Sequence, residues 1–519
     1  MAVFDEERQL LASPGRSPEE TTSVEDPIAV AVHLRPARRH GIDSHFAPTD
    51  PDPRLDVTEM RHIGAPLKRL LKSRKFQFFL ILPNQLIFWI VIATGIWGVT
   101  DPGRNFGPAI TWYLWFCLVF VMMAVVGRAW CSMCPFGGFG EWVQRKALFK
   151  RAQKALGLGW KLPERWAGHG LVLSVVAFVI LTFIEEYANI AGPGAPIATS
   201  IMVLGIVTFA LLSFLVFERR TFCRYLCPLS SLIGSVGSLG MVAGFRSKSR
   251  SVCLECNTKD CMRGSEDGYG CPWYTWPGSA DSNALCGLCT ECYKSCPSDN
   301  IGLFVQKPLT SVIAPVRRRA DIGVAVAVLF GLVAYQQYNA FGWYANVDNW
   351  LNNHLHFPHY PDPVAYLGGI TLGALVLFGA AMLLRAIAKP RDEASGVTFW
   401  FTTFAYAMIP VTGADYLARQ LPKFFKYVLR VPSTIVSPLG IHLGVFNTRL
   451  LSDPWIVTVQ VAIMGLGTAA SLYAMHRISQ RDFLPTTTRP LTLYISGLTT
   501  VLVLSGVVSV MYIAMQAAN

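Results

Sequence analysis

The chain has 519 residues, of which 52% are hydrophobic and 15% charged, and its mean hydropathy is +0.38. Soluble globular proteins carry roughly 25% charged residues, so this composition excludes an ordinary soluble enzyme and predicts a membrane protein. The formal net charge is +12, but the Lys and Arg residues lie beside apolar stretches. That distribution is typical of membrane proteins, so we expect a lipid bilayer, and no nucleic acid, as the partner of the basic residues.

The N-terminal segment is rich in Pro, Asp, Glu, Arg and Ser and has no apolar stretch of the kind found in a secretory signal peptide. Such a composition cannot bury enough apolar surface to fold alone. The sequence therefore predicts a disordered cytoplasmic tail over residues 1–65.

Nine stretches are long and apolar enough for membrane-spanning helices, which need about 20 residues. They cover residues 77–99, 108–127, 169–190, 198–217, 321–338, 364–386, 397–415, 455–475 and 491–514. If the N-terminus is inside, the basic clusters all fall on the same side of the membrane. They lie at Lys68–Lys75, Arg145–Lys154, Arg219–Arg224, Arg317–Arg319 and Arg385–Arg391. This pattern predicts a multi-pass protein of the cell inner (cytoplasmic) membrane, with its N-terminus in the cytoplasm and its C-terminus outside.

Two segments do not follow this simple layout. Residues 416–452 should be external, yet they carry five Arg and Lys residues, so they form an interfacial helix or one C-terminal span is miscounted. Residues 229–245 are too short to cross the membrane, and their glycines recur at three- or four-residue steps. We expect an interfacial or re-entrant helix there, whose small-residue face packs closely against the spans.

The first four spans contain an internal repeat. The second span is followed by Arg128-Ala-Trp-Cys131-Ser-Met-Cys134-Pro, and the fourth by Arg220-Thr-Phe-Cys223-Arg-Tyr-Leu-Cys227-Pro. Each copy is a pair of helices that leads into a Cys-Pro motif. The two copies should therefore place their cysteines at equivalent depths on the cytoplasmic side.

Eight of the 13 cysteines fall in one polar segment after the repeat. They are Cys253, Cys256, Cys261, Cys271, Cys286, Cys289, Cys292 and Cys296. The last four form the run C-x2-C-x2-C-x3-C-P, which is the spacing of ferredoxins with two [4Fe–4S] clusters, where the fourth cysteine ligates the other cluster. A zinc ribbon is the alternative, but it uses two separated C-x2-C pairs.

The crossed ligation of such ferredoxins divides the eight cysteines into two sets of four. Cys253, Cys256, Cys261 and Cys296 would hold one cluster, and Cys271, Cys286, Cys289 and Cys292 would hold the other. The spacing before Cys261 and Cys271 is looser than the usual pattern, which leaves the exact fourth ligands open. We expect two [4Fe–4S] clusters.

These elements predict a mainly α fold, a polytopic transmembrane helical bundle with an inserted cytoplasmic ferredoxin-like domain. The membrane core with the two repeats would cover residues 66–245, and the two-cluster domain residues 246–316. About five further helices would form a C-terminal membrane region over residues 317–519.

The two Cys-Pro repeats followed by the eight-cysteine segment resemble the NapH/NosR-like membrane-bound ferredoxins, over roughly residues 70–310. The resemblance implies a four-helix membrane core, two cytoplasmic [4Fe–4S] clusters and a link to the quinone pool. Members of the NosR branch also carry an external flavin-binding domain ahead of the first span. This chain has only a short polar segment there, so the resemblance does not extend to a flavin.

The four repeat cysteines, Cys131, Cys134, Cys223 and Cys227, allow three interpretations. They could converge on a third metal site, act as redox dithiols, or lie reduced at helix ends. Cys117, inside the second span, is better explained as a small buried hydrophobic residue.

Other polar residues are weaker candidates. His354, His356 and His359 have a metal-binding spacing, but an interfacial loop with solvated imidazoles explains them more simply. Glu185 and Glu186, at the external end of the third span, and Asp415 could be functional carboxylates or plain interfacial residues.

We therefore expect a membrane-bound iron–sulfur electron-transfer protein, a subunit of the quinol dehydrogenase type, which relays electrons between the quinone pool and an unidentified redox partner. The alternative is a maturation factor that supplies reducing equivalents to a metal site in another protein. For the quinone we expect a site at the cytoplasmic edge, packed by Trp130, Phe136 and Tyr225 with Arg128 or Arg220 as hydrogen-bond donor. An external site at Glu185 would need a further electron carrier.

Overall fold

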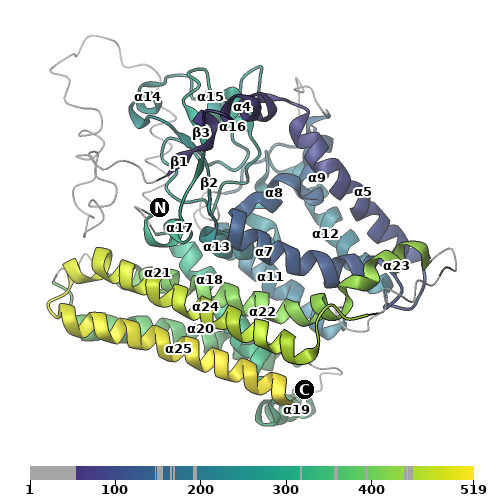
Figure 1. The fold of residues 1–519 in the computed structure, drawn as a ribbon, viewed down its shortest axis with the longest axis vertical. Helices are drawn as coiled ribbons and strands as arrows, with labels where there is room; N and C mark the ends of the chain where they lie inside the picture. The colour runs from purple at the N-terminus through teal and green to yellow at the C-terminus, as the bar shows by residue number, and fades with distance from the viewer. Residues whose placement is uncertain are drawn as a thin grey trace.

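A computed structural model gives the fold (Figure 1). It describes residues 54–146, 148, 156–163, 166, 170–190, 196–315, 318–339, 341–355, 361–391, 396–437, 441 and 448–518. Within these residues, eight helices are long and apolar enough to cross a membrane, and one bent helix pair completes a ninth span. The predicted mainly α, polytopic fold is confirmed.

The N-terminal membrane core consists of the four predicted spans. They are α5 (Phe76–Trp97), the run of α6 (Phe106–Pro108), η3 (Ala109–Trp115) and α7 (Phe116–Val126), then α11 (Gly170–Tyr187) and α12 (Pro196–Val216). The apolar sequence of α7 ends at Gly127, whose φ of 67° lies in the region that only glycine enters at low cost. This turn redirects the chain into η4 (Gly127–Ala129), α8 (Trp130–Met133) and α9 (Pro135–Arg145).

The short apolar segment after the fourth span is helical only in its first part. It forms α13 (Pro228–Val236) and η6 (Gly237–Leu239), and then enters strand β2 (Val242–Ser247), so the predicted helix over 229–245 is too long. The expected close packing of its glycines is confirmed. A Cβ on Gly240 would lie 2.3 Å from the backbone nitrogen of Gly127, so only a glycine allows this approach.

The cluster domain, which is the region predicted to hold the two clusters, is built on a small antiparallel sheet with the strand order β1-β3-β2. The edge strand β1 (Leu55–Asp56) and the 3-10 turn η2 (Val57–Glu59) precede α4 (Gly64–Lys72), while β3 is Ile301–Val305. Residues 54–65 are therefore folded, and the predicted tail is too long at its C-terminal end. Glu59 helps to hold this N-terminal segment on the sheet. Its carboxylate accepts from Lys68 of α4 (2.7 Å) and from Lys248, the residue after β2 (2.6 Å).

Short helices complete this domain around the sheet. They are α14 (Arg250–Glu255), α15 (Asp260–Arg263), α16 (Glu291–Ser295) and α17 (Thr310–Ile313). In Figure 1 the domain caps one end of the N-terminal core, beside α8 and α9.

The C-terminal bundle is arranged around one central helix, α18 (Ala320–Tyr338), of which 78% is buried. Around it lie α19 (Gly342–Leu355), α20 (Pro363–Ala388), α21 (Val397–Ala407), α22 (Ile409–Tyr427), η7 (Val428–Arg430), α23 (Val431–Val436), α24 (Asp453–Ile478) and α25 (Pro490–Ala518). In Figure 1, α24 and α25 run side by side along the outer edge.

The seventh span differs from its prediction. It does not end at residue 415, because α21 and α22 meet at a bend of 43° and the helix continues to Val436. The basic residues that made 416–452 an implausible external loop lie partly on this helix. Arg419, for example, makes a 2.8 Å ion pair with the buried Asp415 one turn earlier. A basic residue that is paired inside a helical bundle does not indicate on which side of the membrane a loop lies.

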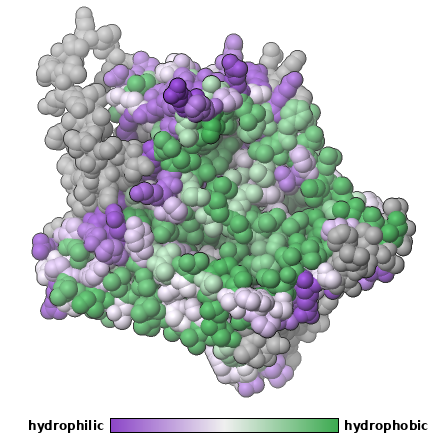
Figure 2. Space-filling view, viewed as in Figure 1, coloured by the Kyte–Doolittle hydropathy of each residue, from purple (hydrophilic) through white to green (hydrophobic). Residues whose placement is uncertain are grey.

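Large apolar side chains cover the outward faces of the bundle. Leu372 on α20, Leu466 on α24 and Val510 on α25 are 55%, 70% and 66% exposed in the isolated chain. Figure 2 shows apolar surface over both helical regions and hydrophilic surface over the cluster domain. A surface of this kind belongs in a lipid bilayer, so the chain is a multi-pass membrane protein.

Candidate functional site: two thiol groups and a membrane cavity

The eight clustered cysteines lie in two groups of four. The thiol of Cys261 interacts with those of Cys253, Cys256 and Cys296. The thiol of Cys292 interacts with those of Cys271, Cys286 and Cys289. These are the two sets that crossed ferredoxin ligation requires. Their roles as ligands stay a prediction, but the structure brings together the residues that the crossed scheme needs.

The two groups are also adjacent to one another. The Cys261 thiol interacts with that of Cys271 across the groups, and the Cys271 backbone N–H donates to the Cys261 carbonyl at 2.7 Å. Neighbouring groups of this kind are suited to electron exchange between two bound clusters.

The backbone of the C-x2-C-x2-C run explains how three cysteines converge. Leu288 and Thr290 both adopt left-handed backbone, with φ of 51° and 64°. Non-glycine residues rarely adopt this conformation and usually do so where a local constraint is met. Here the two reversals turn the chain around one point, and the short helix α16 that follows carries Cys292 and has Cys296 as its C-cap.

The surroundings of the thiols fit iron–sulfur clusters. The indole N–H groups of Trp273 and Trp276 are buried without a protein acceptor among the described residues, and both rings pack in the core that contains the thiols. Buried donors without a partner are costly, and the sulfur atoms of a cluster would accept from them. Asn300 already donates to the Cys253 sulfur at 3.2 Å.

The spacing of the thiols bears on the zinc alternative. Among the residues that the structure describes, no three His, Cys, Asp or Glu side chains are placed to hold a single metal ion. A four-iron cluster binds each thiolate to a different iron atom and so holds them farther apart than one ion does. The preference for iron over zinc therefore rests on the C-x2-C-x2-C-x3-C-P spacing of the sequence.

Burial sets the charge state of several of these thiols before any metal binds. It raises the pKa of Cys261 to about 12 and the pKa of Cys292 well above its usual value, and the neighbouring thiols add to both shifts. Burial also acts on Cys256, but hydrogen bonds from Lys259 and Thr258 outweigh it and lower the pKa of that thiol. Metal binding must therefore displace protons, and iron supplies the positive charge that stabilises buried thiolates.

The four repeat cysteines form a third group. The Cys227 thiol interacts with those of Cys131 and Cys134, and the Cys223 thiol interacts with all three others. Burial raises the pKa of Cys227 to about 12 and that of Cys223 well above its usual value, although Arg220 opposes the shift at Cys223. The four repeat thiols lie together, as a shared site would require, whereas metal binding by them is untested.

One extra residue in the second copy is absorbed by a local change of helix type. The first copy carries Cys131 on an ordinary α-helical turn, but the second forms the π-helical turn η5 (Phe222–Leu226), in which the Cys227 N–H donates to the Phe222 carbonyl at 2.7 Å. A π-turn holds one residue more than an α-turn. Cys134 and Cys227 consequently occupy the same place, the N-cap of a helix that begins with proline.

A cavity of about 90 Å³ lies beside this third thiol group, inside the four-helix core. One water molecule needs roughly 10–15 Å³ of such volume, so the cavity is large enough for a small ring. Its walls are mostly aromatic and aliphatic. The lining includes Trp112, Trp115, Phe116, Arg128, Trp130, Cys131, Cys134, Phe136, Phe178, Thr182, Glu185, Met202, Val203, Ile206, Cys223, Cys227, Ile233 and Trp273.

The two ends of the cavity differ in chemistry. At the thiol end, Arg128 Nε and Trp130 Nε1 are buried donors without a protein acceptor among the described residues, and Trp115 Nε1, on η3, is a further such donor in the lining. At the other end, Glu185 supplies a carboxylate acceptor. Glu185 lies seven residues after the cavity-lining Phe178 on α11, about 10 Å along the helix axis. The cavity therefore offers donors at one end, an acceptor at the other and an apolar middle.

The lining of the cavity differs in two respects from the residues expected to hold a quinone. Glu185 and the Cys-Pro repeats line one cavity, so the external and cytoplasmic sites that the sequence separated are the two ends of a single space. Tyr225 and Arg220 are not part of its lining, whereas Arg128, Trp130 and Phe136 are. Arg220 is instead bonded to the Glu141 carboxylate and donates to the Cys131 carbonyl at 3.3 Å.

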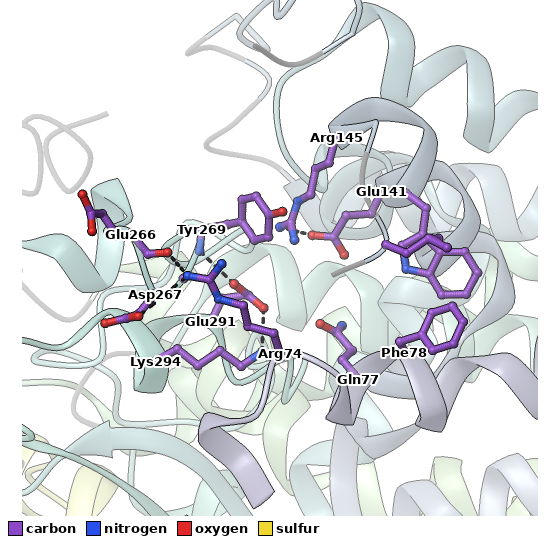
Figure 3. Close-up of a pocket in the computed structure, with 13 residues that line it drawn as sticks. Arg74, Gln77, Phe78, Glu141, Arg145, Glu266, Asp267, Tyr269, Glu291 and Lys294 are labelled. Atoms are coloured by element: carbon purple, nitrogen blue, oxygen red, sulfur yellow. Dashed lines mark hydrogen bonds and ion pairs between the residues drawn. The ribbon is translucent and has the colours of Figure 1, made fainter. Parts of the chain in front are cut away.

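Arg220 links the repeat to the cluster domain. Its guanidinium interacts with the thiols of Cys223 and Cys289, one from each region. Its partner Glu141 also pairs with Arg145, whose guanidinium stacks on the ring of Tyr269 from the cluster domain. Figure 3 shows this small polar pocket, in which Glu141 and Arg145 of α9 face Tyr269 and Glu291 of the cluster domain.

The histidine cluster is only partly described. His354 is exposed at the end of α19, and its ring is tilted against that of Trp350, with 4.2 Å between the centroids. His356 and His359 lie outside the described residues. Sequence reasoning missed Lys423, which interacts with Glu185 from the distant helix α22, because no local motif connects the two positions.

Comparison with known proteins supports an iron–sulfur assignment. Residues 108–155 and 199–244 match the family described as a 4Fe-4S binding domain. Each matched segment holds one Cys-Pro repeat, so the match coincides with the internal repeat. Together they cover less than half of the chain, and they support a ferredoxin-type iron–sulfur electron-transfer protein.

A second comparison finds a relative without an assigned role. The chain is 26% identical over 196 residues to Uncharacterized protein MJ0750 of Methanocaldococcus jannaschii, an alignment that covers 35% of this chain and 74% of that protein. No solved structure matches the chain.

Proposed function

We propose that the chain oxidises a membrane quinol in the cavity of its four-helix core and passes the electrons to two [4Fe–4S] clusters in the capping domain. A redox partner protein would then take the electrons from the clusters. The observation that carries the proposal is the cavity itself, which joins unpartnered buried donors and a carboxylate across an apolar space.

The chemistry of the lining suits a quinone ring. Such a ring is flat and apolar and carries one oxygen at each end. Arg128 Nε or an indole N–H group would donate to a quinone oxygen at the thiol end, and Glu185 would accept from a quinol hydroxyl at its own end of the cavity. A single ring is too short to reach both ends at once, so the cavity would hold the ring at one end or the other. Trp115 and Trp130, whose ring centroids lie 5.2 Å apart, would form part of the apolar wall.

The cluster residues fit the second half of the proposal. Cys253, Cys256, Cys261 and Cys296 would hold one cluster and Cys271, Cys286, Cys289 and Cys292 the other, and each bound cluster exchanges one electron at a time. Arg220 lies between the repeat thiols and the Cys289 thiol, and its positive charge favours negative charge on both sides.

The repeat thiols support a second candidate function. Because Cys131, Cys134, Cys223 and Cys227 line the same cavity, they could hold a third cluster or act as dithiols that receive electrons. Redox dithiols would suit a maturation factor that reduces a metal site in another protein. Quinol-dependent cluster reduction separates the two functions, because a maturation factor does not require it.

A cavity-filling substitution tests the proposal. Ile206→Phe adds volume to the cavity wall, whereas Ile201→Phe on the same helix enlarges a side chain that is 59% exposed on the apolar surface. Oxidised quinone should quench the fluorescence of the cavity tryptophans in the wild type and Ile201→Phe, but much less in Ile206→Phe. Quinol-driven cluster reduction should slow in the same order, while reduction by dithionite stays equal. Equal quinone binding in both variants would place the site elsewhere.

A further inference from the structure

A half-buried charged pair connects the cavity to the C-terminal bundle. Glu185, which lines the cavity, interacts with Lys423 of α22, and the Lys423 ammonium lies 5.7 Å from the ring centre of Trp112, another lining residue. Charged groups within the membrane layer are costly and are kept where they serve a function. The helix that supplies Lys423 lies outside both segments that match the iron–sulfur family.

We propose that Glu185, which lies beside Lys423, is the base that accepts the protons of the quinol, and that the C-terminal bundle forms their exit. This inference rests on the proposed quinol oxidation and assigns it a proton route. It gives the C-terminal helices a role in the reaction.

The proton chemistry balances with two one-electron acceptors. In each transfer the quinol O–H bond breaks and an O–H bond forms on the Glu185 carboxylate, which then releases the proton before it accepts the next. One quinol yields one quinone, two protons and two electrons, and the two iron–sulfur clusters are the class of oxidant that takes the electrons.

The neighbouring charged groups have other partners that hold the helices together. Glu186 accepts from Tyr335 Oη at 3.1 Å and from Gln336 Nε2 at 3.4 Å, both on α18. Asp415 is paired with Arg419 and accepts from Gln337 at 2.6 Å. Tyr366 of α20 also faces the two glutamates, and its hydroxyl lies 2.6 Å from that of Thr182. Of these carboxylates, Glu185 alone belongs to the described lining of the cavity.

The charged residues that follow Lys423 on α22 would lead the protons to water. Lys426 lies three residues after Lys423, and its ammonium is 2.7 Å from Asp453, whose side chain is 54% exposed. Ser174, near the other end of α11, bonds to the Cys227 carbonyl and lies 11 residues before Glu185, about 16 Å along the helix. The protons would therefore leave at the end of the cavity away from the thiols, so oxidation would separate charge along the molecule.

The test uses the full-length protein with its clusters and adjacent glutamates as a matched pair. Glu185→Gln should slow quinol-driven cluster reduction by about 100-fold or more and flatten its pH profile, while Glu186→Gln keeps the wild-type rate and profile. Lys423→Met should move the profile to higher pH, because the carboxylate loses a nearby cation that favours its ionised form. Oxidised quinone should quench the tryptophans equally in all of these proteins.

The outcomes are distinct for the two proposals. If the wild type neither binds quinone nor is reduced by quinol, the proposed function fails. If the wild type is reduced normally but Glu185→Gln shows the same rate and pH profile, only the proton route is wrong. In sealed vesicles, quinol oxidation should acidify the compartment that faces Asp453, and acidification on the side of the cluster domain would also overturn the route.

Discussion

Cys261 and Cys271 lie in the two predicted ligand groups despite their irregular spacing in the sequence. They come from the irregular half of the motif, yet Cys261 lies with Cys253, Cys256 and Cys296, and Cys271 lies with the regular C-x2-C-x2-C run. The extra residues between them form α15 and the loop that returns to it. Their irregular spacing changes the loop and leaves the two thiol groups intact.

Single cysteine substitutions should remove one cluster each. We expect about eight iron atoms per chain after anaerobic purification, and Cys289→Ser should lower this to about four while the other cluster keeps its spectrum. Cys256→Ser should give the converse result. Cys117→Ala, which removes a buried thiol outside the three groups, should leave the iron content unchanged. Loss of both clusters from a correctly folded Cys289→Ser protein, or zinc in place of iron, would contradict the assignment.

At the scale of elements, the two Cys-Pro copies depend on close backbone contacts. The helix α13 and the turn η6 approach Gly127 so closely that a Cβ on Gly240 would overlap backbone atoms. Gly127 ends the second span and leads into Arg128 and Cys131. The packing of these glycines therefore sets the position of one repeat relative to the other.

An alanine at Gly240 should disturb this contact. Since the opposing atoms belong to backbone, which cannot rotate away, Gly240→Ala should destabilise the protein by about 1–3 kcal/mol and lower its melting temperature. Gly205→Ala is the control, because a Cβ there meets no atom within 4 Å. Equal melting temperatures for the two variants would show that the close approach is not required.

Elements and motifs differ in how far the sequence predicts them. The spans follow from composition alone, and the eight-cysteine motif follows from spacing that no other common site shares. The bend between α21 and α22 could not be predicted, because Arg419 and Asp415 form a pair inside the bundle that hydropathy counts only as charge. The interaction between Glu185 and Lys423 could not be predicted either. The two residues are 238 positions apart in the sequence and meet only through the packing of α11 and α22.

At the scale of the whole molecule, the account depends on which way the chain crosses the membrane. The basic clusters near α9, α18 and α20 should lie in the cytoplasm together with the cluster domain. A cysteine introduced at Lys146 should then be inaccessible to a membrane-impermeant thiol reagent in intact cells, whereas one at Asn189 should react. A background variant with Cys256 replaced by serine reduces competing labelling. Reaction at Lys146 and protection at Asn189 would invert the topology.

The central claim is that a quinol in the membrane cavity reduces the iron–sulfur clusters. The direct measurement is electron paramagnetic resonance of the oxidised, cluster-loaded protein after anaerobic addition of a short-chain quinol. We predict the signals of two reduced [4Fe–4S] clusters, which disappear when excess oxidised quinone is added. Clusters that dithionite reduces fully but that show no signal at any quinol-to-quinone ratio would contradict the account and favour a maturation role.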